Sequence, residues 1–236
     1  MYSFNSKVRY SEIDAKGYLS LEAIMNYFQD CSSFHSEELG VGINFLKENN
    51  LTWMIIAWHV QIFRRPCLGE KIIIGTWPHT FRNIKGGRNF VLMDSDGNTL
   101  ARADSDWVLY DTKQGRIARV PKEISDAYTL EEALDMGDFR KIKGTDEGMK
   151  ECDRIIVSPF FLDTNGHVNN VKYLSIAEGH LADKNGYNEF FVEYKNQAFL
   201  KDEISVYFKE NSEESLIVLK NQRDEILVNI EFGKMK

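Results

Sequence analysis

The chain has 236 residues, of which 43% are hydrophobic and 28% charged, and its net charge is −7. This length allows one large domain or two of about 110 to 120 residues, each with its own core. The composition is that of a folded protein rather than a disordered one. The acidic balance argues against general nucleic-acid binding, because phosphate neutralisation needs a surplus of Lys and Arg on one face.

Targeting segments and cysteines narrow the class of protein further. The start of the chain has no signal-type apolar run, and no later segment approaches the length needed to cross a bilayer. We therefore expect a cytoplasmic protein with no membrane span. Cys31, Cys67 and Cys152 are odd in number and lack C-x-x-C spacing, so neither a disulfide framework nor a zinc site is indicated. We expect no metal and no cofactor.

The first half of the chain predicts a strand, a helix and then a run of antiparallel strands. Residues 3–10 alternate in polarity as a strand does. Apolar residues spaced three and four apart predict a helix over 19–39, with Ser20 as its N-cap and Gly40 just beyond its end. Segments rich in β-branched and aromatic residues predict further strands at 51–63, 70–78, 88–94, 100–110 and 117–120.

The second half repeats the first. The pattern Asp14-x-x-Gly17-Tyr18 returns as Asp163-x-x-Gly166-His167, and each pattern is followed by a helix of similar apolar phase. Residues 60–74 likewise parallel residues 192–206. The polar segment 131–150 then reads as a linker between an N-terminal domain, 1–130, and a C-terminal domain, 151–236. Two tandem units of helix plus antiparallel sheet indicate the α+β class.

Functional side chains concentrate in the second copy. Asp163, Asn165 and His167 fall within five residues, just before a helical pattern that begins near residue 170. The first N–H groups of a helix are unpaired donors with a partial positive charge, so they can polarise a carbonyl oxygen. A carboxylate, an amide and an imidazole beside such donors could carry out acyl transfer.

Each of these residues also has an ordinary structural explanation. Asp163 could be an N-cap, His167 a hydrogen-bonded polar residue and Asn165 a turn former. Their convergence on one loop between apolar segments favours a functional site, since buried polar groups need partners. The first copy has Lys16 and Tyr18 in place of the amide and the imidazole. A single site, in the second copy, is therefore expected.

Several stretches carry a resemblance to a known family. They are Tyr10 to Asp14 followed by 21–29, then 58–62 and 101–108, and the most specific is Asp163-x-Asn165-x-His167-Val168-Asn169-Asn170-x-x-Tyr173. Together they resemble the acyl-ACP thioesterases of plants and bacteria over nearly the whole chain. The resemblance implies a tandem double hotdog, with two antiparallel sheets each wrapping a long helix. It also implies that Asp163, Asn165 and His167 are catalytic.

The sequence departs from the plant members of that family at one place. Those enzymes have a Glu followed by a Cys on the strand after the second helix, where this chain has Gln197 and Ala198. A mechanism that needs a second carboxylate or a thiol is therefore in doubt, and Gln197 could at most orient water.

The resemblance implies hydrolysis of fatty acyl-ACP to free fatty acid, which ends chain elongation. The partner would be acyl carrier protein, with no nucleic acid, and the chain would be a monomer or a homodimer. In this hypothesis the helix start around His167 to Asn169 holds the carbonyl oxygen, and Asp163 acts as base or as nucleophile.

The acyl chain would need an apolar pocket in the N-terminal hotdog. Candidate lining residues lie on the first helix and the strand after it; they are Leu21, Ile24, Met25, Phe28 and Trp53. An ordinary hydrophobic core explains the same helical pattern equally well.

Other functions stay open on the sequence alone. Coenzyme A could replace the carrier protein as the thiol, or the protein could bind acyl thioesters without cleaving them. A hotdog hydratase, with a pattern resembling D-x-N-P-x-H, is disfavoured because Gly166 replaces the proline. The basic runs could be solvated turns or a docking face for an acidic partner; they lie at 64–65, 82–88, 116–122 and 140–143.

Overall fold

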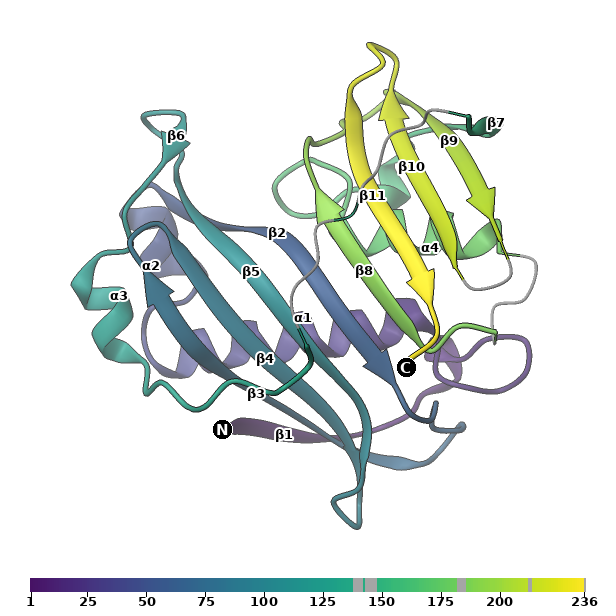
Figure 1. The fold of residues 1–236 in the computed structure, drawn as a ribbon. Coiled ribbons are helices and arrows are strands. Elements are labelled where there is room, and N and C mark those ends of the chain that lie inside the picture. Colours follow the sequence, from purple (N-terminus) through teal and green to yellow (C-terminus); the bar gives the residue numbers. More distant parts are fainter. Residues whose placement is uncertain (138–141, 143–147, 182–185, 212–213, 236) are drawn as a thin grey trace. The chain divides into compact units, whose positions relative to one another are not determined.

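The computed structural model describes residues 1–137, 142, 148–181, 186–211 and 214–235 (Figure 1). The chain divides into two compact units, Met1–Asp138 and Phe139–Lys236, called unit 1 and unit 2 below. The boundary falls inside the segment 131–150 expected as a linker. None of the described helices is long and apolar enough to cross a membrane.

Unit 1 is an antiparallel sheet packed against one long helix (Figure 1). The strands lie in the order β1-β3-β4-β5-β2, and β6 pairs with β5. Their bounds are β1 Tyr2–Lys7, β2 Leu51–Ile62, β3 Lys71–Arg82, β4 Lys85–Asp94, β5 Thr99–Asp111 and β6 Arg116–Ile117. The helices are η1 Tyr10–Glu12, α1 Leu21–Glu38, α2 Ile43–Glu48 and α3 Lys122–Ala127.

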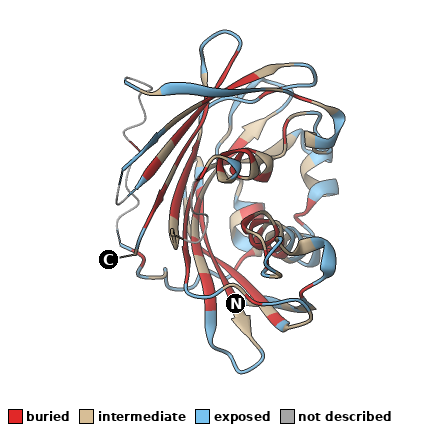
Figure 2. Ribbon diagram, turned by 90° about the vertical axis from the view of Figure 1, so that its right-hand side faces the viewer, coloured by how far each residue is buried: buried red, intermediate tan, exposed pale blue. Residues whose placement is uncertain are grey.

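Helix α1 confirms the prediction made from apolar spacing. Ser20 is its N-cap, and the Ser20 hydroxyl accepts a hydrogen bond from the Ala23 N–H at 3.1 Å. Gly40, two residues past the end, has a φ of +75°, a conformation that glycine adopts without strain. The buried face of α1 packs on β1, β3 and β4. Figure 2 colours the ribbon by burial and shows that strands and helices carry buried residues next to exposed ones.

Unit 2 is a second antiparallel sheet with a shorter helix. Its strands lie in the order β8-β11-β10-β9-β7. Their bounds are β7 Lys150–Ile156, β8 Glu189–Tyr194, β9 Glu203–Glu210, β10 Ser215–Asn221 and β11 Ile226–Gly233, with helices η2 Pro159–Phe161 and α4 Asn170–Gly179. The α+β class is thus confirmed, but the expectation of a long helix in the second copy is wrong. Helix α4 has ten residues against eighteen in α1, and it ends at a glycine, a poor helix former.

Several predicted boundaries are wrong for local reasons. The strand predicted at 3–10 stops at Lys7, because Tyr10–Glu12 turns into a 3-10 helix. Strand β3 continues past Pro78, since a bulge between Pro78 and Thr80 absorbs the missing N–H of proline. Helices α2 and α3 and strand β7 were not predicted, because they are short and mostly exposed.

A buried arginine lies between the sheet and helix α1 of unit 1. Arg88 is only 8% exposed, and it donates hydrogen bonds to His35 Nδ1 at 3.2 Å and Thr76 Oγ1 at 3.3 Å. Its guanidinium also lies 5.1 Å from the ring centroid of Tyr128. Burial, and next the neighbouring Arg88 charge, lower the pKa of His35 to about 4. His35 is therefore neutral in the folded protein near pH 7.

This arrangement predicts that the stability of the protein depends on pH. The substitution His35→Gln should make that dependence weaker. An unfolded histidine titrates near its ordinary pKa of about 6.5, so between that value and about 4 the unfolded state binds more protons. The stabilisation is then complete above about pH 6.5 and is lost as the pH falls toward 4. Glutamine keeps an acceptor for Arg88 without titrating. Urea unfolding between pH 7 and 4.5 should show a shallower loss of stability in the variant, and an unchanged slope would contradict the assignment.

Candidate functional site

The loop between η2 and α4 in unit 2 carries the predicted site. The Asp163 N–H donates to the His167 carbonyl oxygen at 2.9 Å, and the Gly166 N–H donates to the Asp163 carbonyl oxygen at 3.2 Å. Gly166 has a φ of +82°, which side-chain-bearing residues rarely adopt. The backbone therefore closes into a tight turn that holds residues 163 and 167 opposite each other. This segment, residues 162–169, is called the catalytic loop below, after the prediction made from the sequence.

A second segment of unit 2 runs across the catalytic loop. The Val168 N–H donates to the Ala198 carbonyl oxygen at 2.9 Å. The Ala198 N–H donates to the Tyr173 hydroxyl oxygen at 3.0 Å, which ties the same segment to helix α4. The Tyr194 hydroxyl donates to the Asn170 carbonyl oxygen at 3.1 Å. Residues 195–199, called the crossing segment, are thus bonded to both the loop and the helix that follows it.

The three predicted catalytic residues lie together on this loop. The Asp163 and His167 side chains are 28% and 25% exposed, and His167 Nδ1 lies 3.8 Å from Asp163 Oδ1. That distance is too long for a direct hydrogen bond. The Asn165 N–H donates to Asp163 Oδ1 at 2.8 Å. The His167 ring makes an edge contact with Phe199 of the crossing segment, at 5.6 Å between ring centroids.

The N-cap of α4 is Asn169 rather than Asp163. The Asn169 side-chain oxygen accepts from the Val171 N–H at 3.0 Å. The Asn169 N–H is bonded to the Phe161 carbonyl oxygen at 2.8 Å, and the Val168 N–H is occupied as described above. The expectation that these two N–H groups hold a substrate carbonyl is therefore wrong. Among the described residues, the N–H groups of His167 and of Asn170, the first residue of α4, donate no backbone hydrogen bond.

Gln197 lies in the crossing segment, directly before the Ala198 that bonds the loop. Its side chain is exposed, and within the described ranges no hydrogen bond holds it. Sequence reasoning missed the roles of Tyr173, Tyr194 and Phe199 in fixing this segment. Tyr173 belongs to the motif that carried the resemblance, so its spacing from Asp163 was the available signal.

The loop of unit 1 that repeats this motif forms the same backbone bonds. The Asp14 N–H donates to the Tyr18 carbonyl oxygen at 2.8 Å, and the Leu19 N–H donates to the Pro66 carbonyl oxygen at 2.8 Å. Its glycine, Gly17, has a φ of +85°. The repeat seen in the sequence is thereby confirmed in the local structure. The counterpart of the crossing segment is the stretch around Arg65 and Pro66.

The aspartate of the unit 1 loop is more fully bonded than Asp163. Asp14 Oδ1 accepts from the N–H groups of Lys16 at 2.9 Å and Tyr18 at 3.1 Å. Asp14 Oδ2 forms an ion pair with the Arg65 guanidinium at 2.8 Å. Burial acts to raise the pKa of Asp14, but the two N–H groups and Arg65 outweigh it, so the pKa lies below its ordinary value.

The residues expected to line an acyl pocket separate into two places. Leu21, Ile24, Met25 and Phe28 are buried on the inner face of α1. Phe28 packs against Phe90 of β4, at 5.3 Å between ring centroids. Trp53 instead belongs to a different hydrophobic cluster, centred on Val41, Leu109, Ile124 and Tyr128.

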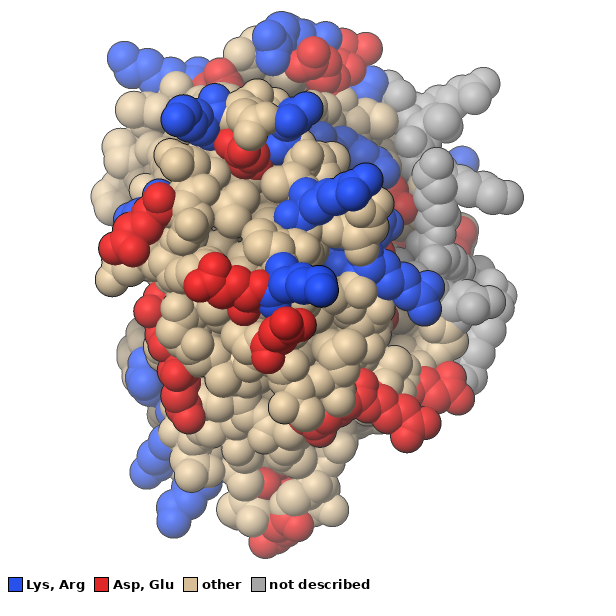
Figure 3. Space-filling model, turned by 90° about the vertical axis from the view of Figure 1, so that its left-hand side faces the viewer, with Lys and Arg blue, Asp and Glu red and all other residues tan. Residues whose placement is uncertain are grey.

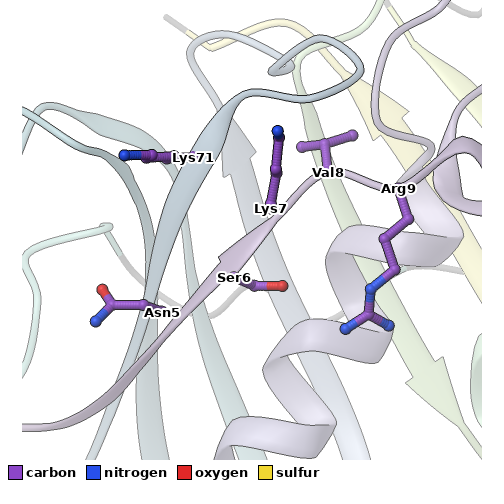
Figure 4. A pocket seen from close by; sticks show the side chains of 6 residues that line it. All are labelled: Asn5, Ser6, Lys7, Val8, Arg9 and Lys71. Carbon is purple, nitrogen blue, oxygen red and sulfur yellow. The ribbon is translucent and has the colours of Figure 1, made fainter.

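One open hollow of unit 1 lies away from these groups, along β1 and the start of β3. It is lined by Asn5, Ser6, Lys7, Val8, Arg9 and Lys71. Figure 4 shows that Lys7, Arg9 and Lys71 point in different directions rather than toward one point. This hollow therefore offers no convergent set of groups for catalysis.

Some residues of the basic runs have partners or are buried within unit 1. Arg64 bonds Glu70 at 2.9 Å, Arg65 pairs with Asp14, and Arg88 is buried. The basic run predicted at 140–143 lies mainly outside the residues that the structure describes. On the face drawn in Figure 3, Lys and Arg side chains lie interspersed with Asp and Glu.

The cysteines and acidic residues show no metal centre in the parts of the chain that the structure describes, since no group of three or more His, Cys, Asp or Glu could hold an ion. Cys31 is buried, and burial raises the pKa of its thiol to about 12. Cys67 and Cys152 are exposed. None of the three lies in the catalytic loop or in the crossing segment.

Comparison with known proteins identifies both units. A model of the acyl-ACP thioesterase N-terminal domain matches residues 1–128, and a model of the C-terminal domain of the same enzymes matches residues 145–232. The palmitoyl-acyl carrier protein thioesterase of Arabidopsis thaliana, a chloroplastic protein, is 28% identical over 72% of this chain. The match covers 44% of that relative, so the chain spans less than half of its length.

Two solved structures share the fold. An acyl-ACP thioesterase from Bacteroides thetaiotaomicron aligns with a TM-score of 0.89 at 22% identity, over 98% of this chain and 96% of that one. The 12:0-ACP thioesterase from Umbellularia californica aligns with a TM-score of 0.86 at 20% identity, over 99% and 97% of the two chains.

The turn geometry predicts opposite effects for two glycine substitutions in unit 2. Gly166→Ala should destabilise the protein by about 1 to 2 kcal/mol, because alanine is strained at positive φ. Gly179→Ala, at the end of α4, meets nothing within 4 Å and has no positive φ, so it should be neutral or stabilise by up to about 1 kcal/mol. Urea denaturation of both variants checks this, and equal effects would mean that the turn is not as described.

Proposed function

The chain belongs to the acyl-ACP thioesterase family, and on that premise we propose that it hydrolyses fatty acyl-ACP and releases free fatty acid, ending chain elongation. The observation that carries the proposal is the match of the two family models to residues 1–128 and 145–232. The catalytic loop in the second of these regions adds a partly exposed carboxylate beside an imidazole.

The chemistry assigns the central role to Asp163. As a general base, its carboxylate takes a proton from water while the water oxygen attacks the thioester carbonyl carbon. Collapse of the tetrahedral intermediate breaks the C–S bond, and the thiolate leaves and takes up a proton. The products are a fatty acid and free thiol. In the alternative, Asp163 attacks the carbonyl itself, and water cleaves the resulting anhydride.

The remaining groups of the loop would support that step. The N–H of Asn170, at the positive end of helix α4, would be a donor for the developing oxyanion. His167, whose ring rests on Phe199, and Asn165 would orient the attacking water. Gln197 would at most position water from the crossing segment. Asn169 acts through its cap, which fixes the helix start.

The fold we propose is a tandem double hotdog. Two loops with the same backbone bonds, one in each unit, support this duplicated architecture. The N-terminal hotdog, 1–130, would hold the acyl chain against Leu21, Ile24, Met25 and Phe28, with 131–150 as linker and 151–236 as the catalytic hotdog. Trp53 is the weaker candidate, since it lies in another cluster.

The partner we propose is acyl carrier protein bearing a fatty acyl thioester, with the chain acting as a monomer or homodimer. A cytoplasmic location stays a prediction. Two alternatives remain for the test below. One is an acyl-CoA thioesterase, and the other is a protein that binds acyl thioesters without cleaving them.

The function predicts thiol release from carrier-protein thioesters that depends on Asp163. A panel of acyl-ACP and acyl-CoA substrates should show faster release from the carrier protein, measured by a thiol-reactive dye. Asp163→Asn should lower kcat by at least about a hundredfold, because the amide cannot accept the proton, while acyl binding changes little. The matched control is Asp14→Asn, the same substitution in the loop of unit 1, which should leave kcat within a fewfold of the native value.

Three results would contradict the proposal. Preferential cleavage of coenzyme A thioesters would change the substrate class. Binding without cleavage of either thioester would indicate a sensor. Equal losses of kcat in the two aspartate variants would mean that the loops act through stability alone.

A further inference from the structure

The two repeated loops differ in what faces their aspartates. Their backbones match in detail: the turn bonds Asp14 N–H to Tyr18 O and Asp163 N–H to His167 O are 2.8 and 2.9 Å. The bond from the Leu19 N–H to the Pro66 carbonyl oxygen and the bond from the Val168 N–H to the Ala198 carbonyl oxygen are also 2.8 and 2.9 Å. The carboxylates themselves are bonded differently: Asp14 Oδ1 accepts from two backbone N–H groups, whereas Asp163 Oδ1 accepts from the Asn165 N–H alone. A side chain adds a second difference.

The side chain that differs between the two units comes from the crossing segment of unit 2 and from its counterpart around Arg65 and Pro66 in unit 1. In unit 1 the residue before Pro66 is Arg65, whose side chain is 14% exposed and whose guanidinium lies 2.8 Å from Asp14 Oδ2. It also lies over the Tyr18 ring, at 5.8 Å from the centroid. The residue in the corresponding place in unit 2, directly before Ala198, is Gln197. Among the described residues, no Lys or Arg pairs with Asp163.

We propose that the neutral side chain at position 197 leaves the Asp163 carboxylate available for catalysis, whereas Arg65 occupies Asp14 and keeps the unit 1 loop from acting as a second site. This inference rests on the proposed function only for its consequence in catalysis. The pairing itself is a property of the two carboxylates and can be measured without any substrate.

The physical reason is the cost of using a paired carboxylate as a base. A guanidinium in contact stabilises the charged form and lowers the pKa of its partner by about one to three units. It also covers the oxygen that a water molecule would approach. In unit 1 the N–H groups of Tyr18 and Lys16 are the larger causes of the lowered pKa of Asp14, and Arg65 lowers it further. A neutral amide can hydrogen-bond a water or a carboxylate oxygen without neutralising it.

The test is to give unit 2 the charge arrangement of unit 1. Gln197→Arg should lower the pKa of Asp163 by about one unit or more, measured by carboxyl ¹³C NMR titration with Asp163→Asn for assignment. With the thioester cleaved by the native protein, kcat should fall at least about tenfold and the acid limb of the pH profile should move to lower pH. Gln197→Asn, which keeps a neutral amide, should lower kcat much less than Gln197→Arg does. Gln114→Arg, in an exposed turn of unit 1, controls for added charge.

The reciprocal variant keeps the proposal testable if Gln197→Arg does not fold. Arg65→Gln should raise the pKa of Asp14 toward its ordinary value and leave kcat unchanged. The proposal is overturned by an unchanged pKa of Asp163 in Gln197→Arg, by a lowered pKa with unchanged kcat, or by an unchanged pKa of Asp14 in Arg65→Gln. If the native protein cleaves no thioester, the proposed function fails, and the titrations still decide whether residue 197 controls Asp163.

Discussion

In each unit, a backbone hydrogen bond joins the loop to the segment that crosses it, and this bond constrains the surrounding structure. In unit 2 the Val168 N–H is held by Ala198, and Ala198 is held in turn by the Tyr173 hydroxyl of α4. Loop, helix and crossing segment are therefore fixed as one piece. Because Gly166 supplies the positive φ of the turn, the loop can reverse direction in few residues and present Asp163 and His167 on the same side.

The same backbone serves two different purposes in the two units. In unit 1, two N–H groups and a guanidinium bond the Asp14 carboxylate, which stabilises the loop but leaves the oxygens occupied. In unit 2 the Asp163 carboxylate accepts one N–H, and its imidazole neighbour lies 3.8 Å away. In two loops with the same backbone, the reactivity of each carboxylate depends on how far its surroundings neutralise its charge.

The interior of unit 1 shows a different use of polar groups. Arg88 is buried with His35, Thr76 and the Tyr128 ring as partners, and no carboxylate pairs with it in the described part of the chain. A buried guanidinium is costly to desolvate. Two neutral hydrogen-bond acceptors and the face of an aromatic ring offset that cost here. Burial, and next the Arg88 charge, lower the pKa of His35, so His35 stays uncharged near pH 7. The stability of the packing around α1 therefore depends on pH.

The sequence by itself determined the elements whose signals are local. Apolar spacing and a serine cap defined α1, segments rich in β-branched and aromatic residues defined most strands of unit 1, and the Asp163 to His167 motif located the candidate loop. The duplication was also readable, because both copies kept the residues that the turn requires. Boundaries set by bulges or short exposed helices were missed, since no local pattern marks them.

Only the tertiary structure decided which atoms of the loop are free. The N–H groups of Val168 and Asn169 looked available from the sequence, yet carbonyl groups from residues 198 and 161 occupy them. Trp53 looked like a neighbour of the α1 residues, yet it packs in another cluster. The contact of Arg65 with Asp14 joins residues far apart in the chain. Hydrogen bonding and charge pairing of this kind depend on distances in space, which residue spacing along the chain does not encode.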